Sequence, residues 1–121
     1  MWEVEYTDEF WEWWKSLNLW EQAAVYETVS LLEQKGPHLS FPYSSGIQNS
    51  RHGAMRELRT QCQGRPLRTL YVFDPRRVAL LLIGGDKTGN DRWYDVCVPL
   101  ADKIYDQYLV ELRSGKPEEE L

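Results

Sequence analysis

Three consecutive runs of strand length, at residues 55–62, 67–74 and 77–84, constrain the fold of this chain more than any other feature. The first two mix apolar with polar side chains, and the third is apolar after its arginine. The short stretches QGRP and DPRR separate the runs. Stretches of this kind are turn signals typical of hairpins. The sequence therefore predicts an antiparallel meander of three strands in the middle of the chain.

The N-terminal part predicts a strand followed by two helices. Residues 2–6, WEVEY, alternate apolar and acidic side chains, which is typical of a half-buried strand. Thr7 is the expected N-cap of a first helix, because two acidic residues follow it in the first turn, where the helix dipole favours them. A second helix is expected over 19–35, ending at Gly36. Together they form an α-hairpin.

The C-terminal part predicts one more helix. The run at 92–98, RWYDVCV, either adds a fourth strand or begins the last segment, and Pro99 is expected to open a helix reaching about residue 112. The remainder, 113–121, is too polar to pack and is expected to be an acidic flexible tail. Residues 1–112 then form one small α+β domain, an antiparallel twisted sheet of three or four strands. We expect its helices on one face of the sheet and the other face open.

Charge is distributed unevenly along the chain. The formal net charge of −5 is the sum of −6 over residues 1–50, +5 over 51–92 and −4 over 93–121. Charges are screened over about 8 Å at physiological salt, so distant acids do not cancel a local basic surface. The middle segment therefore favours a site for an anion, and a solvated sheet edge is the simpler alternative.

The loop that follows the third run, GGDKTG at 84–89, does not have the spacing of a nucleotide-binding loop. A Walker loop requires a different glycine–lysine spacing and a helix immediately after it. A dinucleotide site requires a βαβ unit, which the predicted order does not contain. We expect Gly84 and Gly85 to end the strand and let the backbone turn, with Lys87 pointing toward the open sheet face.

Other chemistries have no signature in the sequence. His38 and His52 lack metal-ligand spacing, and Cys62 and Cys97 lack both a paired motif and a partner base. No Gly-x-Ser-x-Gly is present. We expect no metal and no cofactor. No apolar run approaches the roughly 20 residues of a membrane span, and the acidic N-terminus lacks a signal-peptide profile. The expected location is cytoplasmic, without a membrane partner.

The basic segment, residues 51–92, carries cations and aromatic rings on neighbouring predicted strands. Guanidinium groups match phosphate oxygens and aromatic rings stack on exposed bases, so a sheet face carrying both predicts an RNA surface. Alternation places Met55, Glu57 and Arg59 on one face of the first run, and Arg56 and Leu58 on the other. The candidate RNA-binding residues are Arg51, Arg56, Arg59, Arg92 and Trp93.

The segment from residue 52 to residue 89 resembles the RelE/ParE superfamily of bacterial toxins, most closely its HigB-like, phage-derived branch. The runs MRELR, RTLYVF and LLLIGGDK carry the resemblance, together with the closing PLADKIYDQYL. It spans residues 2–112 and matches the predicted order of elements. The resemblance implies a growth-arresting toxin that pairs with a helix-turn-helix antitoxin, for example as a heterotetramer.

RelE- and HigB-like members cut mRNA in the ribosomal A site without a metal, by attack of the ribose 2′-hydroxyl on the adjacent phosphate. The resemblance implies that Arg68 stabilises the charged phosphorane, that Lys87 supplies a second cation, and that Tyr94 stacks on a base or transfers a proton. Removing one such stabilising group typically lowers the rate by about 10²–10³-fold.

The chain departs from RelE in the strand that here reads MRELR. RelE has two lysines there, and Met55 and Glu57 stand in their places. The general base is therefore open between Glu57, His52 and Lys87, with Tyr94 as the candidate acid. Glu57 is expected to be a structural partner of a neighbouring arginine.

Two other functions fit the same resemblance. ParE-like members share the fold and inhibit DNA gyrase, and an inactive protein-binding module would also keep the fold. The missing lysine pair favours these alternatives, whereas Arg68 and Lys87 favour the ribonuclease.

Overall fold

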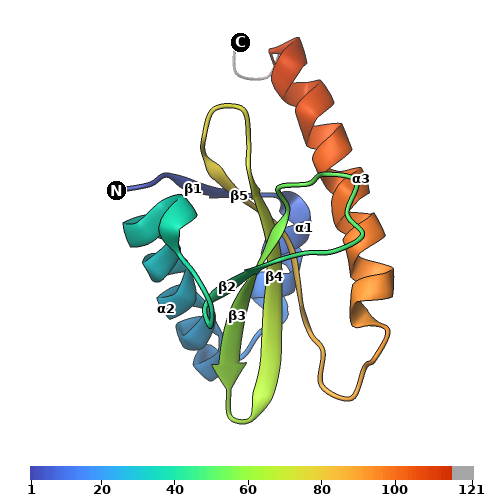
Figure 1. Ribbon diagram of the computed structural model, residues 1–121. Helices are drawn as coiled ribbons and strands as arrows, with labels where there is room; N and C mark the ends of the chain where they lie inside the picture. The colour runs from blue at the N-terminus through green and yellow to red at the C-terminus, as the bar shows by residue number, and fades with distance from the viewer. Residues whose placement is uncertain (116–121) are drawn as a thin grey trace.

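The computed structural model describes residues 1–115 and confirms the predicted α+β class and its RelE-like order of elements (Figure 1). The first part of the chain forms β1 (Val4–Tyr6), α1 (Asp8–Ser16), α2 (Leu19–Lys35) and a short 3₁₀ turn, η1 (Gly36–His38). The second part forms β2 (Ser44–Gly46), β3 (Arg56–Cys62), β4 (Arg65–Phe73), β5 (Ala79–Asp86) and α3 (Trp93–Ser114).

The sheet contains the predicted antiparallel meander of β3, β4 and β5 at its centre. It is larger than predicted, because β1 pairs in parallel with β5 at one edge and β2 pairs antiparallel with β3 at the other. The order over the described residues is β1-β5-β4-β3-β2, so the sheet is mixed rather than wholly antiparallel. The Ser-Ser-Gly of β2 carries no apolar alternation, which is why the sequence did not reveal it.

Helices cover both faces of this sheet, which corrects the prediction of an open face (Figure 1). On one face α1 and α2 pack over a core that includes Phe10, Val25, Leu32, Leu67 and Tyr71. On the other face α3 packs over a second core that includes Leu70, Val72, Leu80, Leu82 and Ile104. Alternation along β4 sends neighbouring side chains to different cores, and its central residues are buried on both sides.

The predicted helix starts hold for the first two helices. The Thr7 hydroxyl accepts a hydrogen bond from the Phe10 amide at 3.1 Å, as an N-cap does. Asn18 and Glu21 form a reciprocal capping box at the start of α2, which explains the break between the two helices.

The last helix begins at Trp93, which resolves the choice left open for 92–98 and corrects the predicted start at Pro99. Pro99 lies inside α3 on its exposed side, where the missing amide hydrogen removes one bond of the helical ladder. The helix continues to Ser114, and Gly115 ends it in a left-handed conformation with φ 77°. The start of the predicted tail at 113 is therefore helical, and its remainder lies outside the described residues.

The prediction that Gly84 and Gly85 turn the chain is wrong, because both residues lie within β5. A Cβ atom on Gly84 would lie 2.2 Å from the Trp13 ring of α1, and one on Gly85 would lie 2.4 Å from Nε1 of Trp93 in α3. The two glycines thus let one tryptophan from each layer lie against the strand. The turn itself uses Gly89, at φ 63°.

Candidate functional site

A buried carboxylate, that of Glu57 on β3, lies at the centre of a cluster of charged and polar side chains on the α3 face. Glu57 is only 5% exposed. The hydroxyl of Tyr94 donates to its Oε1 at 2.5 Å, and the hydroxyl of Ser45 donates to its Oε2 at 2.6 Å. Nη1 of Arg59 reaches Oε2 at 3.3 Å. Both carboxylate oxygens are therefore occupied. We call Glu57, Ser45, Arg59, Arg68 and Tyr94 the Glu57 cluster.

Arg68 is the buried cation of this cluster. It lies on β4 opposite Arg59 of β3 and is 4% exposed. Its Nε lies 3.5 Å from Oε1 of Glu57, an ion-pair distance, and makes no hydrogen bond within the described chain. Its Nη1 donates to the carbonyl of Leu67 at 3.0 Å. An uncompensated buried charge is costly, so Glu57 is the counter-ion that allows Arg68 to lie here.

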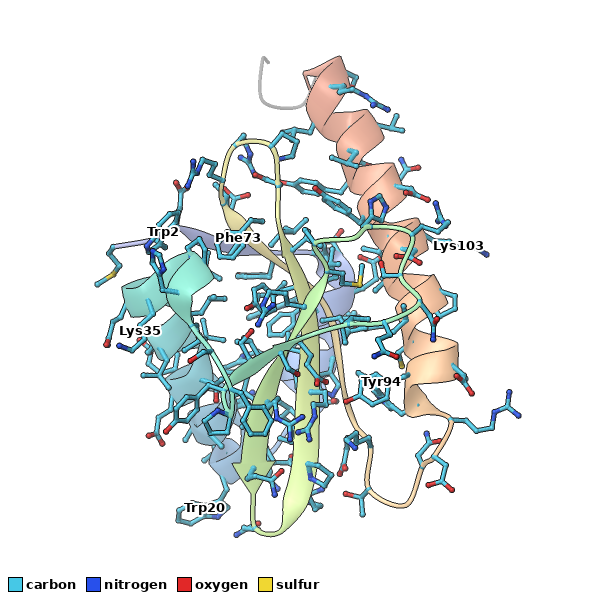
Figure 2. All side chains as sticks on the ribbon, in the orientation of Figure 1. Trp2, Trp20, Lys35, Phe73, Tyr94 and Lys103 are labelled. Atoms are coloured by element: carbon cyan, nitrogen blue, oxygen red, sulfur yellow. The ribbon has the colours of Figure 1, made fainter. Side chains whose placement is uncertain are left out.

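Tyr94 enters the cluster from the first turn of α3 and points toward the sheet (Figure 2). Burial raises the pKa of its hydroxyl above the ordinary value, and the hydrogen bond to Glu57 raises the pKa further, while Arg68 acts in the opposite direction. The phenol is therefore a protonated donor at neutral pH. Nζ of Lys87 lies 5.5 Å from the centre of the Tyr94 ring, a cation–π contact that places a third cation beside those of Arg59 and Arg68.

Members of the cluster line two clefts. Glu57 and Tyr94 border a cleft of about 290 Å³, whose other wall is the 46–49 loop with the amide side chains of Gln48 and Asn49. Arg59 and Arg68 border a wider cleft of about 450 Å³ between α2 and β3. A phosphate diester in the wider cleft would meet the guanidinium groups of Arg59 and Arg68, and one in the first cleft would meet the phenol of Tyr94 beside the Glu57 carboxylate.

The structure brings together Arg59, Arg68, Lys87 and Tyr94 from the predicted site residues. The predicted alternation along β3 is confirmed, since Met55 packs in the α3-side core and Leu58 in the opposite core. The expected pairing of Glu57 with an arginine is also present, to two arginines rather than one.

His52 and Arg51 lie elsewhere. Nε2 of His52 is 2.8 Å from Oδ1 of Asp106, and Nη2 of Arg51 is 2.5 Å from Oδ2 of the same residue. Asp106 follows Tyr94 by 12 positions on α3, which is about 18 Å along the helix axis. These contacts attach the loop before β3 to α3. They do not bring His52 to the Glu57 cluster.

The remaining predicted RNA-binding residues also lie outside the cluster. Arg56 is on the opposite face of β3, where its Nε donates to the Ser44 hydroxyl at 3.0 Å. Arg92 is exposed at the start of α3. Trp93 is 4% exposed and packs against Gly85, so its ring is not available to stack on a base, which corrects that prediction.

Ser45 is the cluster member that the sequence did not indicate. It lies on β2, directly opposite Glu57 in the β2–β3 register. A serine in a polar loop carries no signal of its own, and only the pairing of the two strands identifies it. The β2 strand is the element that carried no apolar pattern.

The described residues contain no group of three or more His, Cys, Asp or Glu side chains arranged to hold a metal ion. Among the same residues, no helix is both long and apolar enough to cross a membrane.

Comparison with known proteins gives the family. A family model described as "Phage derived protein Gp49-like" matches residues 12–106. A protein named "Putative toxin HigB3", from Mycobacterium tuberculosis (strain ATCC 25618 / H37Rv), is 40% identical over 104 residues, which is 85% of this chain and 90% of that protein.

A second protein of that organism, named "Putative toxin HigB2", is 38% identical over 95 residues, which is 77% of this chain and 47% of that protein. The chain therefore spans about half the length of this second relative. No solved structure matches the chain significantly. These similarities confirm the HigB-like, phage-derived branch to which the resemblance pointed. The chain belongs to the Gp49-like family of phage-derived proteins.

Proposed function

We propose that this chain is the toxin of a toxin–antitoxin pair and that it cleaves mRNA on the ribosome without a metal. The first part is supported by the names of the two relatives, both of which are toxins by their printed names. The second part is carried by one observation: the guanidinium of Arg68 and the protonated phenol of Tyr94 converge on the same carboxylate, that of Glu57.

The reaction needs a fixed cation at the phosphate and a proton for the leaving oxygen. The ribose 2′-hydroxyl gives its proton to a base, for which Glu57 and Lys87 are the candidates that contact Tyr94. Its oxygen forms a bond to phosphorus as the bond from phosphorus to the 5′ oxygen breaks, which leaves a 2′,3′-cyclic phosphate and a 5′-hydroxyl. Negative charge develops on the equatorial oxygens, where preorganised donors act most strongly. Arg68 supplies this donor group, and Tyr94 protonates the 5′ oxygen.

Glu57 and Lys87 support these two groups. Glu57 holds the Arg68 side chain and the Tyr94 hydroxyl in one geometry, because its carboxylate contacts both. Positioning of this kind contributes to catalysis only if the groups stay fixed. Lys87 lies against the Tyr94 ring and adds positive charge where an RNA strand would pass.

The test is controlled expression in bacteria with mapping of mRNA 5′ ends after induction. We expect growth arrest and new ends within translated codons, which disappear when an inhibitor stalls ribosomes. Arrest with intact mRNA would contradict the ribonuclease, and assays of DNA breaks and gyrase activity would then separate the ParE-like alternative. Absence of arrest, with the protein accumulating in the cells, would indicate the inactive binding module.

Replacing the Tyr94 hydroxyl tests the proton donor, with thermal unfolding recorded in parallel because this hydroxyl also donates to the buried Glu57 carboxylate. In Tyr94→Phe the ring contact with Lys87 is retained, and the proton donor is lost. Since positioned general acids typically contribute about 10²–10⁴-fold, we expect ribosome-dependent cleavage to fall by about 10²-fold or more. Tyr108→Phe is the matched control, because the Tyr108 hydroxyl bonds Glu5 and Arg76, away from the cluster. Equal cleavage by Tyr94→Phe and the parent would remove Tyr94 from the mechanism.

A further inference from the structure

An apolar groove lies on the outer side of α1 and α2, on the face of the sheet opposite the Glu57 cluster. Its volume is about 250 Å³. We call its lining residues the aromatic groove: Tyr6, Trp11, Trp14, Tyr26, Val29 and Glu33. Tyr6 is 55% exposed, Trp11 41% and Tyr26 64%. The Tyr6 and Trp11 rings stack with centroids 5.6 Å apart.

Exposed rings gathered around one depression need an explanation. Single exposed apolar side chains are ordinary, but clustered ones rimmed by polar residues mark interaction surfaces. Tyrosine and tryptophan are the residues that most often anchor protein interfaces. The neighbouring sheet residues Val4 and Leu81 close the floor of the groove, so it is the size of one or two inserted apolar side chains.

The charge around the groove selects the occupant. Residues 4–33 contain seven acidic residues and a single basic one, Lys15. Three of the seven acids are in ion pairs: Glu12 with Lys15, Glu5 with Arg76 and Glu21 with Arg65. The acids that remain among the described residues are Asp8, Glu9, Glu27 and Glu33. Glu33 lines the groove itself. An RNA strand would be repelled, and two copies meeting groove to groove would bring like charges together. The complementary occupant is a cationic peptide segment with apolar anchors.

We propose that the aromatic groove binds a cationic amphipathic helix of the partner antitoxin. Apolar side chains on one face of that helix insert among Tyr6, Trp11 and Tyr26, and lysines or arginines beside them face Glu33 and the neighbouring acids. Helices of this kind dock in grooves through anchors at i, i+3 or i+4 and i+7. The identity of the partner rests on the proposed function, whereas the surface and its charge do not.

A synthetic probe tests the surface directly. The probe is a fluorescein-labelled 18-residue helix with leucine at i, i+3, i+4 and i+7 and lysine on its other faces. Its comparison peptide carries glutamate in place of lysine. Fluorescence anisotropy with the full chain measures the dissociation constant. We expect the lysine peptide to bind and the glutamate peptide to bind at least tenfold more weakly, because the groove rim is acidic.

Matched variants show whether the peptide uses the groove. Tyr26→Ala and Glu33→Lys are expected to raise the dissociation constant at least tenfold. Trp20→Ala and Asp95→Lys are the controls, since neither residue lines the aromatic groove. Trp20 is 71% exposed and points away from the body of the molecule (Figure 2), and Asp95 lies on α3. The controls should change the constant less than twofold. Equal losses in groove and control variants, or binding of both peptides alike, would overturn the proposal.

Co-expression then tests the partner. The candidate antitoxin is any helix-turn-helix protein that is found encoded beside the toxin gene. We expect Tyr26→Ala to arrest growth like the parent but to escape neutralisation by that protein. Full neutralisation of Tyr26→Ala would overturn the proposed docking. If the parent itself causes no arrest, the proposed toxin function fails, and the peptide result still decides whether the groove binds a cationic helix. The proposed docking would also be overturned if the parent protein dimerises and Tyr26→Ala abolishes that dimerisation.

Discussion

Cleavage of mRNA is expected to fall about 10²–10³-fold in Arg68→Lys, with the protein still folded. Lysine keeps the positive charge that Glu57 requires, but it lacks the planar fork that holds two phosphate oxygens at once. The measurement is the yield of new mRNA 5′ ends per unit of protein in a purified translation reaction, with thermal unfolding recorded in parallel. Cleavage by Arg68→Lys at the parental rate would contradict the role assigned to this guanidinium.

Arg68→Ala is expected to lose both cleavage and stability, because it leaves the Glu57 carboxylate buried without its counter-ion. Breaking a buried ion pair in this way typically destabilises a protein by about 3–5 kcal/mol. The double variant Arg68→Ala with Glu57→Gln removes the orphaned charge, so we expect it to regain part of the stability and none of the cleavage. Recovery of cleavage in the double variant would show that Arg68 acts only through folding.

Arg92→Ala is the matched control for these variants. The Arg92 side chain is 78% exposed, and its Nε lies 3.8 Å from Asp95, a surface pair of small energetic value. The substitution removes the same charge from an exposed side chain at the start of α3, outside the Glu57 cluster. We expect cleavage within about twofold of the parent if phosphate contact at Arg92 contributes only to general RNA attraction.

Gly84→Val is expected to give the largest loss of stability among substitutions away from the Glu57 cluster. A Cβ atom at this position would lie 2.2 Å from the Trp13 ring, a distance that requires the ring or the strand to move. Overpacking in a close-packed core typically costs about 1–3 kcal/mol, and sometimes more. Denaturant unfolding followed by tryptophan fluorescence measures the free energy. Gly53→Ala is the control, since a Cβ atom there meets nothing within 4 Å.

The partner of this clash can be tested separately. Trp13→Leu removes the ring that covers Gly84, at the cost of buried apolar area. In the double variant Gly84→Ala with Trp13→Leu, the loss of stability should be smaller than the sum of the two single losses. Contacting residues usually show coupling of about 0.5–3 kcal/mol. Strict additivity would indicate that the glycine is required for a reason other than the tryptophan.

The elements that could be predicted from the sequence are those whose ends depend on a few neighbouring residues. Thr7 caps α1, and the turn between β3 and β4 is the Gln63–Gly64 half of the predicted QGRP, since Arg65 and Pro66 already pair in β4. The turn at DPRR separates β4 from β5. Capping and turn geometry depend on a few neighbouring residues, so they were predictable. The start of α3 was not predictable in this way. Its first turn reads as a short apolar run, and such runs fit a strand or a helix equally well.

The candidate site also contains residues that could be named from the sequence and residues that only the fold could place. Arg68 and Tyr94 were named from the resemblance, and the fold places both against Glu57. Lys87 was named in the same way and lies beside the Tyr94 ring. Trp93, which neighbours Tyr94 in sequence, was expected at the RNA surface and instead fills the core. Adjacent residues on a helix point in different directions, so sequence proximity to a site residue does not decide exposure.

The sequence by itself determined the order of elements other than β2, the faces of β3 and the uneven charge, because each depends on periodicity or composition along the chain. Only the tertiary structure decided that α3 covers the second face of the sheet and that Ser45 meets Glu57 across β2. It also separated His52 from Tyr94 by binding it to Asp106. These outcomes depend on contacts between residues far apart in sequence, and on burial of charge that requires a partner from another strand or helix.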